Sequence, residues 1–239
     1  MKRYVTFGEL MLRLSPPGRE LLFQSPSLTA TFGGAEANVA VSLANYGETV
    51  SFVTSLPENA VADSALRELR GFGVDTSFIR RGGERVGIYY AEAGSCMRPS
   101  KVIYDRAHSS ITEVSPADFN WEEIFDGAHW VHTTGITPAI SAGTAAAALE
   151  AVKAAKKFGL RVSCDLNYRK KLWKWGKSPQ EVMTEMAGCV DILIANEEDC
   201  QKCLGIELDV DVTAGSLDSS KYKLLAEKIM KRFPNISAL

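Results

Sequence analysis

The sequence predicts an α/β protein built on a mainly parallel sheet, with a small β-sheet inserted into it. Short apolar runs alternate with helical patterns along most of the 239 residues, which is typical of a parallel sheet. One stretch, residues 80–109, breaks this alternation and reads as two strands with no helix between them. The length suits one large domain or one domain plus a small one. A content of 46% apolar and 23% charged residues excludes a disordered chain, a collagen and a disulfide scaffold.

Five apolar runs predict the strands of the parallel sheet. They are Tyr4–Phe7, Val50–Thr54, Ala128–Thr133, Leu160–Leu166 and Val190–Ala195. Between the runs, Ser141 and Ser178 are expected to cap helices, and Pro179 suits the first helical position. Further helices are expected over residues 61–70 and 220–232, with a polar loop over residues 207–220. Residues 236–239 resemble the start of another strand.

The inserted stretch contributes two strands, Gly87–Ala93 and Lys101–Ala107, and Leu10–Leu14 is expected to be a third strand of the same small sheet. These assignments divide the chain into an α/β core and a β lid. The core is predicted to comprise residues 1–9, 33–80 and 110–239, and the lid residues 10–32 and 81–109.

Charge and cysteine content narrow the function classes. The 27 basic and 29 acidic residues leave no positive field to hold nucleic acid. No apolar run approaches the about 18 residues that a membrane span needs, and the first residues contain no apolar segment typical of a signal peptide. Five cysteines, an odd and small number, favour a reducing compartment. The sequence therefore predicts a cytoplasmic protein without nucleic-acid or membrane partners.

Ligands of open α/β sheets bind outside the carboxyl ends of the strands. Four of the five predicted strands end in polar residues. These ends are Gly8-Glu9, Thr133-Thr134-Gly135, Asp165-Leu166-Asn167 with Arg169 just beyond, and Asn196 to Asp199. The alternative is that polar residues simply begin the following loops or cap helices.

The segment Gly33-Gly34-Ala35-Glu36-Ala37-Asn38-Val39-Ala40 places a glycine pair before a helix. Glycine lets a ligand approach the backbone, and a helix N-terminus offers free N–H groups. Gly34 and Asn38 are four residues apart and share a helix face, so a sugar hydroxyl could meet a backbone N–H and an amide together. The segment is neither a Walker loop nor a dinucleotide fingerprint, which disfavours a nicotinamide dehydrogenase.

Side-chain alternation in the lid strands places Tyr104 and Arg106 on one face, with Tyr89 in the neighbouring strand. Phenols and a guanidinium suit a hydroxylated, anionic small molecule. Residues 80–109 also contain six basic and three acidic side chains. The alternative is a solvated hairpin with ordinary edge charges.

Three other features predict structural roles. Cys200 and Cys203 form a lone C-x-x-C on a helix, without the second ligand pair of a zinc site. His129 and His132 are three residues apart in a strand and face opposite sides, so they cannot chelate one metal. His108 is more often structural than catalytic in such a position.

The glycine-pair segment resembles the first motif of the ribokinase-like (PfkB) carbohydrate kinases. Phe7-Gly8-Glu9, the β insertion and Asn196-Glu197-Glu198-Asp199 fit the same family. Val102 to Ala107 and Asp165 to Trp173 look most like the 2-keto-3-deoxygluconate kinases, while fructokinases share the general layout and remain an alternative. The resemblance implies a doubly wound α/β core with a β lid, and transfer of the ATP γ-phosphate to a hydroxyl of a sugar acid.

The resemblance also implies roles for individual residues, with ATP and Mg²⁺ as cofactors. The substrate residues would be Glu9, Gly33, Gly34, Asn38, Tyr89, Tyr104, Arg106 and Arg169. The nucleotide residues would be Asn167, Tyr168, Arg169 and Asn196, and Asp199 would be the metal residue. Asp199 stands where the family often has glutamate. A homodimer or larger homo-oligomer formed through the lid is expected, because the lid face that carries Ile88, Tyr90 and Ile103 is apolar.

The family's second motif, Gly-Ala-Gly-Asp, does not occur in this chain. In the family its aspartate is the base and its glycines stabilise the transferring phosphoryl group. The expectation is therefore a sugar-acid kinase without its C-terminal part, with little activity as this chain alone and with no catalytic base named. The alternative from another class is a non-catalytic, sugar-binding or oligomerising protein. Sequencing the reading frame beyond Leu239 distinguishes the two.

Overall fold

A computed structural model describes residues 2–207 and 219–239 of the chain. It divides into two compact units, one of Met1–Val5 with Ser115–Leu239 and one of Thr6–Val114. The predicted loop at residues 207–220 lies almost entirely outside the described residues. The boundaries of these units differ from those of the predicted α/β core and β lid. The division into core and lid stays a prediction.

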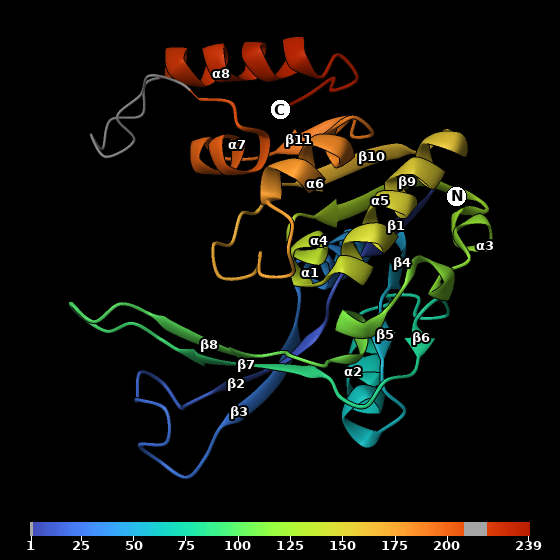
Figure 1. Cartoon of the computed structure of the whole chain (residues 1–239). Coiled ribbons are helices and arrows are strands. Elements are labelled where there is room, and N and C mark those ends of the chain that lie inside the picture. The colour runs from blue at the N-terminus through green and yellow to red at the C-terminus, as the bar shows by residue number, and fades with distance from the viewer. Residues whose placement is uncertain (1, 208–218) are drawn as a thin grey trace. The chain divides into compact units, whose positions relative to one another are not determined.

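The first unit contains a parallel sheet in the order β11-β10-β9-β1 (Figure 1). Its strands are β1 (Arg3–Phe7, which continues into the second unit), β9 (Ala128–Thr134), β10 (Arg161–Asp165) and β11 (Ile192–Ile194). In the parallel register, Val162 of β10 lies beside Val131 and Cys164 beside Leu193. All four side chains are at most 1% exposed, so the middle of this sheet is the core of the unit.

Two helices of the first unit, those starting after Ser141 and Ser178, begin where the sequence predicts caps. The helices of this unit are α3 (Trp121–Phe125), α4 (Ile136–Ile140), α5 (Ala142–Lys157), α6 (Pro179–Ala187), α7 (Glu197–Leu204) and α8 (Ser219–Arg232). The hydroxyl of Ser141 accepts the Thr144 N–H, and that of Ser178 accepts the Glu181 N–H. The alanine-rich α5 packs closely on β9 and β10 because its inward side chains are small.

The residues after α8 begin a further strand, as the sequence predicts. Ala238 forms a parallel bridge with Ile192, and its carbonyl accepts the Leu193 N–H at 3.0 Å. This segment therefore adds to the β11 side of the sheet.

The second unit contains β4 (Thr49–Val53) beside the end of β1, where the Gly8 N–H donates to the Val53 carbonyl. Two helices, α1 (Ala35–Asn45) and α2 (Ala60–Gly71), and the short parallel pair β5 (Ser55–Leu56) and β6 (Arg80–Arg81) complete this part. Asn59 caps α2 by accepting the Ala62 N–H, as an N-cap side chain should.

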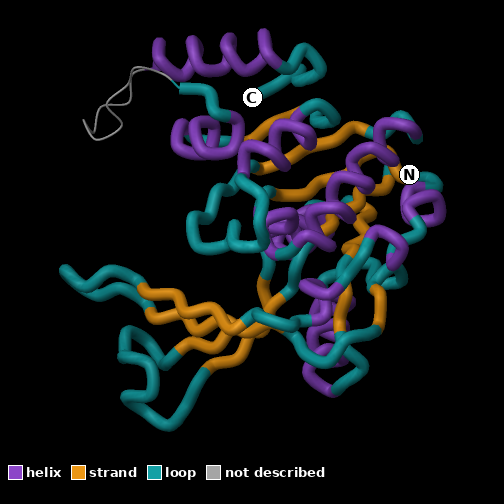
Figure 2. Tube along the Cα trace, viewed as in Figure 1, coloured by secondary structure: helices purple, strands orange, loops and turns teal. Residues whose placement is uncertain are grey.

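A separate four-stranded sheet, here called the lid sheet, has the order β3-β2-β7-β8 (Figures 1 and 2). Its strands are β2 (Met11–Ser15), β3 (Thr29–Gly33), β7 (Gly87–Glu92) and β8 (Lys101–Asp105). The outer pairs are antiparallel hairpins, and β2 and β7 join them in parallel. The predicted third strand is thus confirmed, whereas β3, β5 and β6 were not predicted from the sequence.

The five predicted strands of the parallel sheet are all present, each within a few residues of its predicted ends.

Among the described residues, no helix has both the length and the apolar character needed to cross a membrane.

Candidate functional site

One face of the lid sheet, here called the Arg13 face, carries the predicted substrate residues Tyr89 and Tyr104. Residues paired across neighbouring strands project to the same side. The first row therefore contains Gly33, Met11 and Gly87, and the Cβ of Arg106 lies next to Gly87. The second row contains Thr31, Arg13, Tyr89 and Tyr104.

The glycines in the first row leave room for neighbouring polar groups. A Cβ added to Gly33 would lie 3.2 Å from the Tyr89 hydroxyl and 3.8 Å from the Asn38 amide oxygen. The phenol and the amide therefore converge over the Gly33 backbone. Asn38 is exposed, so its amide is accessible to a ligand.

Gly34 precedes α1 and lies against the backbone of Glu9. A Cβ at this position would come within 1.9 Å of the Glu9 carbonyl oxygen, so only glycine fits. Gly34 is the N-cap residue of α1, and glycine has no side chain that could accept a hydrogen bond from the N–H groups of the first helical turn. The sequence motif thus places a helix N-terminus without a side-chain cap near Asn38.

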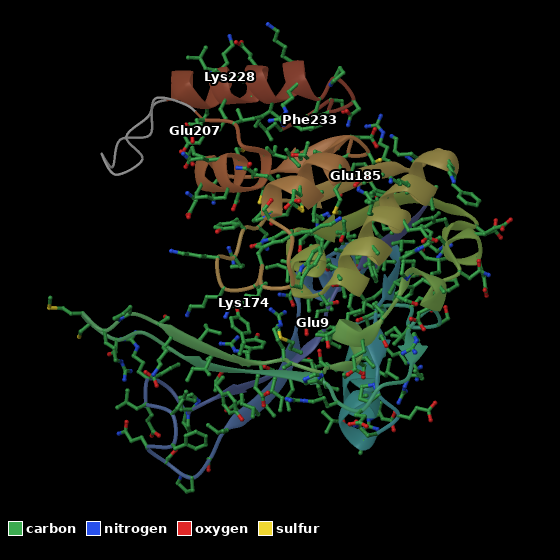
Figure 3. All side chains as sticks on the ribbon, in the orientation of Figure 1. Glu9, Lys174, Glu185, Glu207, Lys228 and Phe233 are labelled. Carbon is green, nitrogen blue, oxygen red and sulfur yellow. The ribbon has the colours of Figure 1, made fainter. Side chains whose placement is uncertain are left out.

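Glu9 and Arg106 form a buried ion pair within the second unit (Figure 3 labels Glu9). The side chains of Glu9 and Arg106 are 2% and 11% exposed, and the Ser109 hydroxyl lies 3.4 Å from the second Glu9 oxygen. Burial lowers the pKa of Arg106 to about 10, so the guanidinium stays charged at neutral pH. Its Nε is buried without a hydrogen-bond partner, and its Cζ lies 5.1 Å from the Tyr104 ring centre.

The two predicted phenols lie side by side, with ring centres 6.1 Å apart. Burial raises the pKa of Tyr89, and the positive charge of Arg13 opposes this shift. Tyr89 is therefore a neutral hydroxyl at physiological pH, able both to donate and to accept a hydrogen bond.

In the first unit, the predicted nucleotide residues follow β10. Asn167 adopts a left-handed backbone conformation, with φ of 39°, which asparagine tolerates better than most residues. Its N–H donates to Asp165 at 3.1 Å, and the Tyr168 N–H donates to Asp199 at 2.8 Å. Burial raises the pKa of Asp165, and the Asp199 charge adds to this effect. Arg169 is exposed.

Asn196 and Asp199 form a reciprocal capping box at the start of α7. The Asn196 side chain accepts the Asp199 N–H at 2.8 Å, and Asp199 accepts the Asn196 N–H at 3.2 Å. Both Asp199 oxygens therefore accept backbone N–H groups, and the residue is 6% exposed. No group of three or more potential metal ligands occurs among residues 2–207 and 219–239, and the metal role of Asp199 stays a prediction.

The residues set aside in the sequence have local partners. His132 shares the Ser163 hydroxyl with the Trp130 indole, and burial lowers its pKa to about 4. Cys200 and Cys203 are buried, which raises the pKa of each thiol to about 12. These thiols are therefore protonated and unsuited to a metal at neutral pH.

The structure thus brings together Gly33, Asn38 and Tyr89 in one place, and Glu9 with Arg106 beside Tyr104 in another, all within the second unit. Asn167, Tyr168 and Asp199 lie together in the first unit. Sequence reasoning missed Arg13 and Ser109. Alternation within Leu10–Leu14 could have placed Arg13 on a face with Met11, but only the register with β7 puts it beside Tyr89.

The family profile described as "pfkB family carbohydrate kinase" matches residues 1–228. The chain belongs to this family. It is 35% identical over 213 residues to the 2-dehydro-3-deoxygalactonokinase of Haloferax volcanii, covering 89% of this chain and 66% of that protein. It is 27% identical to the 2-dehydro-3-deoxygluconokinase of Bacillus subtilis, covering 78% of this chain and 58% of that protein. The chain thus spans about three fifths to two thirds of the length of these relatives.

Solved structures of the family agree with the fold. The crystal structure of 2-dehydro-3-deoxygluconokinase from Thermotoga maritima is 47% identical and superposes with a TM-score of 0.91, covering 98% of this chain and 70% of that one. A pfkB family carbohydrate kinase from Listeria grayi is 31% identical, with a TM-score of 0.85. These comparisons bear out the ribokinase-like α/β fold with a small separate β-sheet.

Proposed function

We propose that the protein is an ATP-dependent kinase of a keto-deoxy sugar acid, similar to 2-keto-3-deoxygluconate. The observation that carries the proposal is the Arg13 face, where hydroxyl-binding and carboxylate-binding groups lie on one small sheet. Family membership supports the kinase chemistry, and the sugar-acid kinases among the relatives support the substrate class.

The sugar hydroxyls would bind where the Gly33 backbone, the Asn38 amide and the Tyr89 phenol converge. These groups include both donors and acceptors, as a sugar hydroxyl needs. The backbone N–H groups at the start of α1, which follows Gly34, would also donate to the sugar. A side chain added at Gly33 would enter this space, and one added at Gly34 would collide with the Glu9 backbone.

The carboxylate of the acid would bind Arg106, whose buried Nε has no hydrogen-bond partner. A guanidinium binds a carboxylate through paired, charge-assisted hydrogen bonds, which a neutral sugar cannot form. Tyr104 would cover the same guanidinium from its ring face. Glu9 holds Arg106 in place. Arg169, in the first unit, is likewise proposed as an acid-binding residue.

ATP supplies the phosphoryl group, and Mg²⁺ neutralises part of its charge. Asn167, Tyr168, Arg169 and Asn196 would bind the nucleotide. Magnesium typically takes one or two protein carboxylates together with phosphate oxygens and water, which fits Asp199 as a single carboxylate. The capping hydrogen bonds of Asp199 keep its orientation fixed.

The test is an ATP-consumption screen with the protein expressed from its complete gene. It compares 2-keto-3-deoxygluconate and its galactonate epimer with fructose and ribose. The proposal expects kcat/KM for the two acids to exceed that for the neutral sugars by at least tenfold. A preference for fructose would instead identify a fructokinase, and binding without ATP consumption would identify a sugar-binding protein.

Compartment and assembly complete the proposal. We propose that the reaction takes place in the cytoplasm, where ATP is available. The five cysteines, which are all free in the structure, suit this reducing compartment. We also propose a homo-oligomer formed through the lid sheet.

A further inference from the structure

The charge balance around Arg106 raises a question about how a sugar acid binds. Glu9 already neutralises the Arg106 guanidinium in a site where both side chains are buried. A second carboxylate at Arg106 would place two negative charges around one positive charge. Such an arrangement is unfavourable in a poorly solvated site unless another cation lies close by.

The Arg13 face contains one further cation. Of the residues on this face of the four strands, with Arg106 beside them, only Arg13 and Arg106 carry a positive charge. Arg13 has no carboxylate partner among the described residues, and its Nε donates to the Ser15 hydroxyl at 3.1 Å. The residue is exposed to solvent.

The register fixes where this cation lies. Arg13 pairs directly with Tyr89, which pairs with Tyr104. Arg106 lies one row away, about 7 Å along the strand direction, and on the β8 side, two strands or about 10 Å across the sheet from Arg13. Arg13 and Arg106 therefore flank Tyr89, from two different sides, within the reach of two arginine side chains.

Other cations near the lid sheet are already paired or lie elsewhere. Arg85 binds Asp105, which belongs to the opposite face, and Arg98 lies 3.7 Å from Glu92. Arg169 belongs to the first unit, and its role in the acid site stays a prediction. Within the second unit, Arg13 is thus the cation with the geometry to compensate a ligand's charge.

We propose that Arg13 is a specificity-determining residue: with Tyr89 it forms a second anion-binding position on the lid sheet that supplies the positive charge for a sugar acid's carboxylate. The proposal rests on the proposed sugar-acid function. In this proposal Arg106, which Glu9 holds in place, orients the carboxylate. Arg13 supplies the electrostatic attraction that distinguishes an acid from a neutral sugar.

The test uses the protein from its complete gene and the variants Arg13→Ala, Arg13→Gln and Arg13→Lys. The ligands are 2-keto-3-deoxygluconate and its uncharged carboxamide. We expect Arg13→Ala and Arg13→Gln to raise Kd and KM for the acid about tenfold, with kcat within twofold and the carboxamide unaffected. Arg13→Lys should restore part of the affinity because it keeps the charge.

Arg67→Ala is the matched control, because Arg67 is also exposed and donates to a nearby serine, Ser64, but lies on α2. Raising the salt concentration should weaken acid binding more in the wild-type protein than in Arg13→Ala. Equal losses for acid and carboxamide would overturn the proposal, since Arg13 would then only support the sheet. The proposal would also be overturned if Arg13→Ala kept the wild-type preference for the acid. The same holds if Arg169→Ala lost that preference and Arg13→Ala did not.

The two proposals fail in different ways. If the wild-type protein binds neutral sugars and not the acid, the proposed function is wrong. If it binds the acid and Arg13→Ala keeps that preference, only the role of Arg13 is wrong. Thermal unfolding and circular dichroism of each variant verify that the comparison is made between folded proteins.

Discussion

Arg106 and Glu9 depend on each other, because each is the charged partner of the other in a buried site. Arg106→Ala should lower kcat/KM for the keto-deoxy acid by roughly 10- to 150-fold, while the value for fructose changes much less. It should also lower the free energy of unfolding by about 3–5 kcal/mol, since the Glu9 carboxylate loses its partner.

The double variant Glu9→Gln/Arg106→Gln separates these two effects. Replacing both charges removes the unpaired carboxylate and should recover most of the stability, but not the preference for the acid. The measurements are urea unfolding and kcat/KM for both sugars. If the double variant regains acid preference, Arg106 serves only to hold the lid sheet together.

His132 should make the stability of the protein depend on pH. Burial lowers its pKa to about 4, below the ordinary value of about 6.5, so the unfolded chain takes up the proton first as the pH falls. The stability that the neutral, buried His132 contributes is fully present above about pH 6.5 and is lost progressively as the pH falls from 6.5 to 4. At pH 5 the loss is about 2 kcal/mol.

Urea unfolding at pH 7.5 and pH 5 tests this expectation. His132→Gln should flatten the pH dependence, whereas His129→Gln, in the same strand but less buried, should leave it as in the wild-type protein. A wild-type slope that survives in His132→Gln would assign the pH dependence to other groups.

Ion pairs of this kind could not be read from the sequence. Glu9 and Arg106 are 97 residues apart, and no spacing rule links them. By contrast, the pattern Asn196-Glu197-Glu198-Asp199 already contains its own capping box, because both partners lie within one helical turn. Residue-level prediction therefore worked where the interaction is local.

At the level of elements, α7 depends on Asp199 for its first turn and for its link to Tyr168. Asp199→Asn replaces one acceptor oxygen with a donor, so the free energy of unfolding should fall by about 1 kcal/mol. The proposed metal role adds a second expectation, a several-fold higher Mg²⁺ concentration at half-maximal activity. Asn120, which caps α3 by accepting the Glu123 N–H, offers Asn120→Ala as a control for cap loss alone.

Loss of stability without a change in the Mg²⁺ requirement would contradict the metal role and leave Asp199 as a cap.

Strands with regular alternation or continuous apolar character could be predicted, whereas the shortest ones could not. β5 and β6 have two residues each, too few to show a period. β3 reads Thr-Ala-Thr-Phe-Gly and is mostly exposed, so its sequence carries no burial pattern. Its pairing with β2, and hence the Arg13 face, is a tertiary property that local sequence does not encode.

At the level of the whole molecule, the second face of the lid sheet predicts self-association. Ala30, Leu14, Tyr90 and Ile103 form one apolar row across the four strands, and Ile103 is 42% exposed. Two copies packed through this face would cover it. Ile103→Glu should therefore shift the protein from dimer to monomer in sedimentation at micromolar concentration.

Val102→Glu is the control, because Val102 is 40% exposed in the same strand but lies on the Arg13 face. A wild-type protein that sediments as a monomer, or a dimer that Ile103→Glu leaves intact, would contradict this mode of assembly.

The parallel pairing of β2 with β7 also has a consequence for synthesis on the ribosome. Met11 pairs with Gly87, 76 positions later in the chain. The first hairpin is complete at Gly33, 54 positions before Gly87, so at about 5–20 residues per second it stays without its partner strand for roughly 3–11 s. An isolated two-stranded hairpin is only marginally stable, so during this interval the edge of β2 is open to other nascent chains. Chaperone cover of the emerging chain should therefore matter most between translation of the first hairpin and translation of β7.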